Sequence, residues 1–531
     1  MKELVSATVA APGFYGLNTQ ESGALLSDGF ALRASNCVID KYGRLGARKG
    51  WLMRTTSGSS VLSGQPIRGI FEYLNANGDI DYISAGNNKL FLGGIGGALT
   101  DITPTMTITA SNWQMSSLYD HCVIVQQGHE PVIFSRHTGS PVCSLLINHT
   151  AHSGSFSSPI FGTGVDNGPN CILAAYGRLW TARSNNNKTT IWWSTDIADV
   201  NFPTFNTGGS STAGSMNINA KLPNNADEIV GLAAHNGYIV VFLRQNIVIL
   251  RGGDDNFSNP ASMFVQDVIP GVGCIARDSI QKTGNDILFL SASGVRSLGR
   301  TVQEKSMPMT DISKNVRDDL YAYVANTSPN EIRSCFSEKN AFYLLSFPST
   351  TTPVVFCFDM RAPLQDASAR VTTWDSYQAY ALSANRDGSL YIGKPNGIGE
   401  YYGYTDNGTG YPFIYYTTYF DFGQSTTNKI VKKVGIVMIG GGGQSIVLKL
   451  GFDYADAYES FATTLSTKTP AEYNIAEYNI AEYSSGVFVD TVNTPLGGQG
   501  KVVQMGFEAT VNGAPLSIQK MDIFTKLGRS Y

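Results

Sequence analysis

The sequence is short of charged residues. Asp, Glu, Lys and Arg make up only 15% of its 531 residues, whereas about 25% is usual in a soluble protein. Their balance gives a formal net charge of -4, so the chain has no basic field with which to hold nucleic acid. Any DNA that meets this protein should therefore slide past without adhering. The low charge also suggests that neighbouring chains cover part of the surface.

Long apolar runs and cysteine pairs are missing as well. No run approaches the ~18 residues that span a bilayer. Glu3 interrupts the short apolar patch at the amino terminus, which we therefore assign to the mature protein and not to a signal peptide. No two of the seven cysteines form a C-x-x-C motif. Their wide spacing within apolar stretches favours buried free thiols, made in a reducing compartment, over disulfides or a zinc site.

Motifs of enzyme chemistry are also absent. The sequence holds no G-x-S-x-G, no complete G-x-G-x-x-G and no Walker-type loop. It therefore gives no indication of acyl transfer or of nucleotide chemistry. Most of the histidines fall in one region but lack H-x-H or H-E-x-x-H spacing: His121, His129, His137, His149 and His152. The acids at 254–255 and 453–459 do not match the calcium-loop pattern. We predict no catalytic residue, no metal ligand and no cofactor.

What the sequence has in abundance is glycine, with 56 copies, and short runs of β-branched residues. In the stretch 228–298, the runs 239–243 and 247–250 are almost wholly apolar, and turn dipeptides such as Asn236-Gly237 separate the runs. This pattern is typical of antiparallel hairpins. Strands that are apolar at nearly every position must be covered on both faces, as they are inside a stack of sheets.

The hairpin pattern recurs along the chain. Units begin near 67, 119, 171, 229, 274, 335 and 380, a spacing of roughly 45 to 60 residues that is close to a four-stranded blade of ~40 to 50 residues. We therefore predict a mainly β fold in which residues 51–425 form a β-propeller of six or seven blades. One departure is a short amphipathic helix expected from Asp311, with Ile312, Val316 and Leu320 on its apolar face.

Residues 1–50 differ in pattern from the propeller region. Two short strands, 36–40 and 45–48, flank a turn in which Gly43 can take a positive φ. The segment ahead of them has too few large apolar residues to fold alone, but enough to anchor it as an N-terminal arm on another surface. The candidates for contact with a neighbouring subunit are Phe14, Tyr15, Leu25, Leu26, Phe30 and Arg44.

The pattern changes again over residues 426–531, where the strands become longer. Val434, Ile436 and Met438 take every second position, which predicts a C-terminal antiparallel β-sandwich, or platform, with one wet face. A pentapeptide repeat, AEYNI AEYNI AEYSS, interrupts these strands at 471–485. Period five fits neither helix nor strand, so we expect an irregular extension. Its acids are candidates for lining a channel: Glu472, Glu477 and Glu482.

Four stretches carry a resemblance to a known family: GLNTQESGALLSDGFALRASNCVIDKYGRLGARKGW, LAAYGRLWTARS with IWWSTDIADVNF, GNDILFLSASGVRSLG and the closing PLSIQKMDIFTKLGRSY. Together they resemble the tail nozzle, or tail tubular, protein family of short-tailed bacteriophages. The resemblance implies a homo-hexameric ring of propellers and a β platform, which surrounds the channel through which the genome leaves. A neutral or mildly acidic wall fits that role, because it repels the duplex weakly within a Debye length of about 8 Å.

The same resemblance implies a place and partners. The protein would belong to the tail of the virion and be assembled in the host cytoplasm. A portal-adaptor ring would lie above it, with tail spikes or fibres and a needle or plug beside or below it. Genomic DNA would pass through without specific binding, and no membrane span is expected.

Two other functions stay open. A receptor-binding or glycan-degrading tail propeller would hold sugars on its face, with Trp180, Trp192 and Trp193 as platforms, although such tryptophans are more often blade core. A cellular propeller could instead serve as an interaction scaffold. A closed ring in the particle supports the nozzle, glycan binding lost in Trp192→Ala supports the second function, and a monodisperse monomer supports the third.

Overall fold

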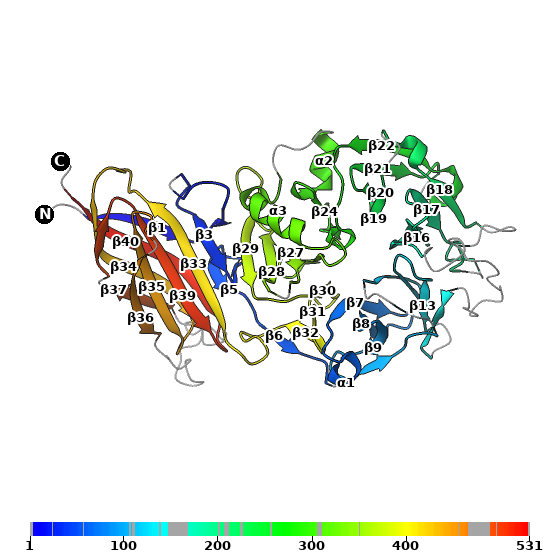
Figure 1. Ribbon diagram of the computed structural model, residues 1–531, viewed down its shortest axis with the longest axis horizontal. Helices are drawn as coiled ribbons and strands as arrows, with labels where there is room; N and C mark the ends of the chain where they lie inside the picture. Colours follow the sequence, from blue (N-terminus) through cyan, green and yellow to red (C-terminus); the bar gives the residue numbers. More distant parts are fainter. Residues whose placement is uncertain are drawn as a thin grey trace, which may run out of the picture.

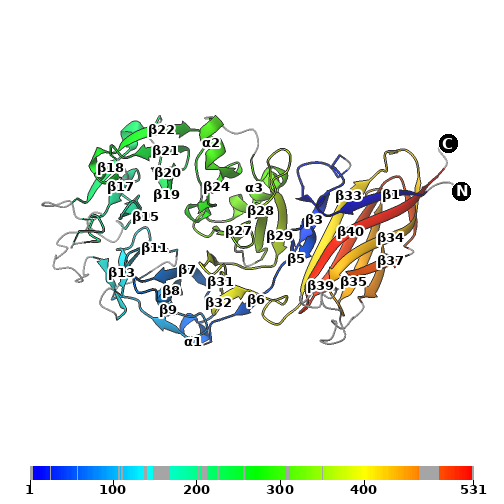
Figure 2. The ribbon, with the colours of Figure 1, turned by 180° about the vertical axis from the view of Figure 1, so that it is seen from behind.

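Antiparallel hairpins account for most of the protein, and in the computed structural model they build a β-propeller beside a pair of larger sheets (Figure 1). Figure 2 shows the same arrangement from behind. The structure describes residues 4–528 except for gaps at 24, 57, 106–107, 109–111, 137–139, 147–167, 200–201, 206–211, 224–226, 255–256, 305–310, 350, 456, 466–488 and 495.

The predicted β-propeller is confirmed, with six four-stranded blades in the part of the chain that the structure describes. Four blades lie one after another in the chain: β7 (Ile67–Leu74), β8 (Ile80–Gly86), β9 (Lys89–Gly93) and β10 (Leu99–Asp101); β11 (Gln114–Leu118), β12 (His121–Val125), β13 (Val132–Ser135) and β14 (Val142–Leu145); β15 (Cys171–Ala175), β16 (Arg178–Ala182), β17 (Thr190–Trp193) and β18 (Gly214–Asn217); β19 (Ile229–His235), β20 (Tyr238–Leu243), β21 (Asn246–Arg251) and β22 (Phe264–Pro270). Next come a three-stranded sheet and then the fifth blade: β23 (Gln281–Lys282), β24 (Ile287–Ser291) and β25 (Gly294–Ser297); β26 (Arg333–Ser337), β27 (Phe342–Phe347), β28 (Val354–Asp359) and β29 (Arg370–Asp375).

The sixth blade joins the two ends of the ring. It consists of β30 (Ala381–Ala384), β31 (Leu390–Lys394) and β32 (Gly397–Tyr401), completed by β6 (Trp51–Met53), which pairs antiparallel with β32. Because β30 also contacts β7 of the first blade, the ring is closed. In the apolar strand β20, Ile239–Leu243 are buried on both faces, as the sequence predicts.

One ten-stranded sheet runs from the propeller into the C-terminal part. The edge strand β29 of the fifth blade pairs in parallel with strands from the amino terminus, β2 (Gly16–Leu17) and β3 (Phe30–Ser35). The sheet continues through β33 (Tyr411–Phe420), β39 (Val503–Val511), β35 (Ser445–Phe452) and β36 (Tyr458–Thr464). Residues 16–35 therefore connect the two parts of the protein by main-chain hydrogen bonds.

A seven-stranded sheet packs against the C-terminal half of this sheet. Its strands are β37 (Val489–Thr494), β34 (Lys429–Gly440), β40 (Leu516–Leu527), β5 (Leu45–Ala47) and β4 (Cys37–Ile39), with β1 (Val5–Ala10) on β40 and β38 (Gly498–Gly500) on β34. Val434, Ile436 and Met438 are all fully buried in the core that the two sheets share. The C-terminal part begins with β33, ahead of the boundary predicted at 425, because β33 pairs with β39 and not with a blade.

The helices are few and short among the described residues: α1 (Gly58–Leu62), α2 (Leu298–Glu304) and α3 (Arg317–Asn326). The helix expected from Asp311 begins later, at Arg317, after a 3₁₀ turn. Ile312 donates its backbone N–H to the carbonyl oxygen of Val295 in β25, and a turn at 312–313 precedes the 3₁₀ turn. Ile312, Val316 and Leu320 are buried, as predicted. None of the described helices is long and apolar enough to cross a membrane.

Candidate functional site

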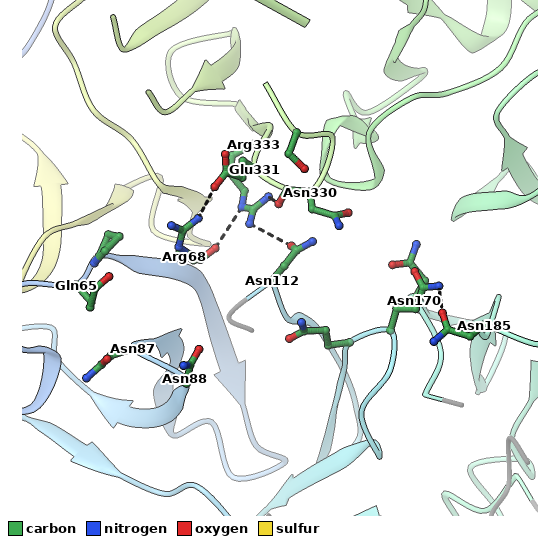
Figure 3. Close-up of a pocket in the computed structure, with 14 residues that line it drawn as sticks. Gln65, Arg68, Asn87, Asn88, Asn112, Asn170, Asn185, Asn330, Glu331 and Arg333 are labelled. Atoms are coloured by element: carbon green, nitrogen blue, oxygen red, sulfur yellow. Dashed lines mark hydrogen bonds and ion pairs between the residues drawn. The ribbon is translucent and has the colours of Figure 1, made fainter. Parts of the chain in front are cut away.

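A polar pocket of about 970 Å³ opens at the centre of the ring, where several blades meet (Figure 3). Its walls come from the segments that lead into β7, β11, β15 and β26, and from the turns after β8, β12 and β16. Nine of the 14 lining residues are asparagine or glutamine. Side-chain amides from four blades therefore make up most of the pocket wall.

Part of this amide content is explained by turn chemistry. Asn87 and Asn88 form the turn between β8 and β9 with φ of 48° and 54°. Asparagine is among the few residues that adopt a positive φ readily in a two-residue hairpin. Asn87 also donates a hydrogen bond to the carbonyl oxygen of Val61 at 3.1 Å. The sequence therefore places amides at this rim for structural reasons, and they face the pocket as a result.

At the base of the pocket, Arg333 lines the cavity and contacts Asp278, which in turn pairs with Arg277. Asp278 lies 2.7 Å from the Nε of Arg277 and 3.1 Å from an amino group of Arg333. Both guanidinium groups also donate to the side-chain oxygen of Asn112, at 2.8 and 3.1 Å. Burial acts to raise the pKa of Asp278, but the two arginines outweigh it and hold that pKa below its ordinary value. Asp278 is therefore favoured as a carboxylate, and it pairs with Arg333 of β26 and with Arg277, which donates to the carbonyl oxygen of Asn170 ahead of β15.

The guanidinium groups at this base are already surrounded by acceptors of their own chain. Arg333 contacts the carbonyl oxygens of Arg68, Asn330 and Ile332, besides Asn112 and Asp278. Its Nε donates to Arg68, one terminal nitrogen lies within reach of Asn330, Ile332 and Asp278, and the other terminal nitrogen donates to Asn112. The arginines consequently act as scaffolding, and recognition is left to the amides around them.

Several of those amides are free. Within the described chain, the side chains of Gln65, Asn88, Gln126 and Asn330 make no hydrogen bond, and the Oε1 of Gln126 is a buried acceptor without a protein partner. Gln126 is only 8% exposed. An amide of this kind can donate and accept at once. The lining has one carboxylate, Glu331, which is paired with Arg68 at 3.1 Å.

The residues predicted to contact a neighbouring subunit do not line this pocket, and most of them contact their own chain. Phe14 and Leu26 are buried, and Tyr15 and Phe30 pack edge to face with ring centroids 5.4 Å apart. Arg44 forms an ion pair with Asp40 at 2.7 Å and lies over the ring of Tyr42. Leu25, in contrast, is 80% exposed. The three acids expected to line a channel, Glu472, Glu477 and Glu482, lie outside the described residues.

The other residues singled out in the sequence do not form a site in the described chain. Trp180, Trp192 and Trp193 are buried in blade cores, so their faces are not available as sugar platforms. His121 and His129 are buried, while His137, His149 and His152 lie outside the described residues. No group of three possible metal ligands occurs among the residues that the structure describes. The seven cysteines are free thiols.

A second cluster of interest is the aromatic cage around Lys394, next to the closing strand β6. Lys394 is 4% exposed, and its Nζ lies 4.5 Å from the ring centroid of Trp51 and 4.2 Å from that of Tyr377. Burial lowers the pKa of Lys394 to about 7, with Asp406 opposing and Arg48 adding to the shift. Its ammonium group therefore releases its proton near neutral pH while the protein stays folded.

In the wild type, the free energy of unfolding should increase with pH because of Lys394, and the variant Lys394→Met should lose this increase. The unfolded chain keeps the Lys394 proton up to the ordinary pKa of 10.5, and the folded chain releases it near 7. Between these values the unfolded state binds more protons, so the free energy of unfolding increases with pH, and below pH 7 the burial penalty is fully present. Relative to Lys394→Met, the wild type should gain about 2 kcal/mol from pH 7 to 9, measured by urea denaturation. The exposed Lys432→Met serves as the control, and parallel profiles for wild type and Lys394→Met would contradict the prediction.

Comparisons with known proteins were made for both sequence and structure. No protein-family model matches the sequence, and no curated protein matches it. One solved structure to which this chain is similar is the β-propeller domain of Cps50 (Swd1) from Myceliophteria thermophila. The two are 9% identical in sequence, with a TM-score of 0.36 over 67% of this chain and 98% of that domain.

Proposed function

We propose that this protein is a structural virion component, a subunit of the ring-shaped tail nozzle that extends the DNA-ejection channel of a short-tailed phage. The observation that supports this role most is the ten-stranded sheet, which joins a blade to the C-terminal sheets by backbone hydrogen bonds. Such a subunit holds its two parts at a fixed angle, and a ring around a channel needs subunits of constant shape. The net charge of -4 fits a wall that does not retain DNA.

In this proposal the C-terminal sheets form the sandwich-like platform and the N-terminal arm locks the propeller to it. Six copies close the ring below the portal-adaptor ring, with spikes or fibres and a needle or plug beside or below. Strands β36 and β37 end their sheets in the described chain, and open strand edges are natural places for contact with a neighbouring copy. Leu25 adds an exposed apolar side chain for such a contact.

The oligomeric state tests this proposal. The purified protein should give a species of six times the chain mass of 57.2 kDa by native mass spectrometry, and imaging of whole particles should show the same ring in the tail. A protein that stays monomeric at all concentrations, together with particles that lack the chain or hold it in a number unfit for a closed ring, would rule the nozzle out.

A further inference from the structure

We propose that the central pocket of the propeller binds a neutral carbohydrate. This activity goes beyond the structural role proposed above and rests on the free amides of the pocket. The site comprises Gln65, Asn88, Gln126 and Asn330 beside the fixed guanidinium group of Arg333.

Amides and sugar hydroxyls are matched in their hydrogen bonding. A hydroxyl group both donates and accepts, and a carboxamide presents a carbonyl oxygen beside two N–H donors. The free amides come from four places in the fold: the segment before β7, the turn after β8, the turn after β12 and the segment before β26. They therefore surround a ligand from several sides. A sugar ring, which carries hydroxyl groups along its whole edge, requires such an arrangement.

Gln126 lines the pocket, but its Oε1 is buried, closed to solvent and without a protein partner. The side chain must therefore rotate before this oxygen can accept a hydrogen bond from a ligand hydroxyl group. A buried acceptor left without a partner costs about 1–3 kcal/mol, so that rotation would also relieve an unfavourable feature of the free protein.

The charge and shape of the pocket disfavour other ligand classes. Phosphate polymers need free cationic groups, but Arg333 is surrounded by protein acceptors and Arg68 is paired with Glu331. Flat apolar ligands need aromatic or aliphatic walls, and Pro66 is the one apolar residue in this lining. The volume of about 970 Å³ lies at the upper end of the ~300 to 1,000 Å³ that is usual for small-molecule sites, which leaves room for more than one sugar ring.

The test is a screen of neutral oligosaccharides against the full-length protein by saturation-transfer NMR, and then titration calorimetry. At least one should bind at millimolar concentration or below. Gln126→Met keeps the side-chain volume and removes the amide, so it should weaken binding by about tenfold, the equivalent of one hydrogen bond. Asn330→Ala, at an exposed position that should tolerate the change, should weaken binding as well. Gln266→Met, on the outer strand β22, is the matched control and should leave binding unchanged.

Three results would overturn the carbohydrate site. One is a lack of binding by every neutral oligosaccharide in the screen. Another is binding that survives both Gln126→Met and Asn330→Ala in folded protein. The third is displacement of the sugar by inorganic phosphate or duplex DNA, because that would show a cationic site. None of these results depends on the number of subunits in the particle, so this site and the nozzle proposal fail separately.

Discussion

Phe14→Ala is expected to lower the free energy of unfolding by about 3–5 kcal/mol, the range for deleting a buried phenyl ring. Phe14 is fully buried and packs edge to face on Tyr415 of β33, with centroids 6.0 Å apart and an angle of 76° between the planes. It precedes β2, the strand that lies between blade and C-terminal sheet. Loss of the ring therefore leaves a cavity at the junction of the two parts.

Leu25→Ala is the matched control for this change. Leu25 belongs to the same arm but is 80% exposed, so its truncation should alter the free energy of unfolding by no more than about 0.5 kcal/mol. Both variants are compared with the wild type by urea denaturation and by native mass spectrometry. If Phe14→Ala kept full stability and lost only the oligomer, the arm would have to lie on a neighbouring copy.

Arg48→Ala should cost about 3 kcal/mol, the lower end of the range for breaking a buried ion pair. The guanidinium is 1% exposed on the side chain and holds Asp406 through two bonds of 2.8 and 2.7 Å. It also donates to Asn36 at 2.9 Å and lies between the rings of Tyr377 and Tyr411, at 4.4 and 4.0 Å. Asp406 keeps 23% exposure, so water limits the penalty for its lost partner.

Two further variants make the Arg48 result specific. Arg44→Ala breaks a pair with Asp40 in which both side chains are about one fifth exposed, and such pairs contribute about 0–1 kcal/mol. Arg48→Lys keeps the charge but loses the two-pronged geometry, so it should recover only part of the stability. The free energy of unfolding of each variant is measured by urea denaturation. Equal decreases in Arg44→Ala and Arg48→Ala would show that the buried pair stabilises the fold no more than the exposed pair does.

The hairpins of the blades could be predicted because their signals are local. Alternation, apolar runs and turn dipeptides lie within one blade, and the prediction of buried strands at 239–243 holds in β20. The closing strand β6 could not be predicted in the same way. Its three residues pair with β32, which lies about 350 positions later, and nothing in a window around Trp51 records that partner.

The position of the arm was unpredictable for a similar reason. Gly16 has a φ of +82°, and a Cβ atom there would lie 2.4 Å from the carbonyl oxygen of Val371. The sequence shows a glycine, but not the distant strand whose close approach requires one. The arm could therefore be expected to lie on another surface, while the identity of that surface, a blade of its own chain, emerged only from the fold.

The pocket is hard to predict from the sequence because neutral amides carry little signal singly. Asn88 is explained by its turn, and Gln126 lies directly after an ordinary strand. Titratable groups, metal ligands and tryptophans are the usual marks of a site in a sequence, and none of them carries this pocket. One usable signal is the position before the first strand of a repeat, since Asn112 and Asn170 stand there in two consecutive blades.

The ladder that passes from β29 through β2 and β3 to β33 also governs how the molecule responds to force. A pull on the C-terminal sheets is transmitted edge to edge into the fifth blade, so no single hinge bond takes the strain. If this protein forms the proposed nozzle and DNA pushes outward on it, the two parts would move together as one rigid unit. In the proposed ring, widening would then come from movement between whole subunits, and not from bending within one.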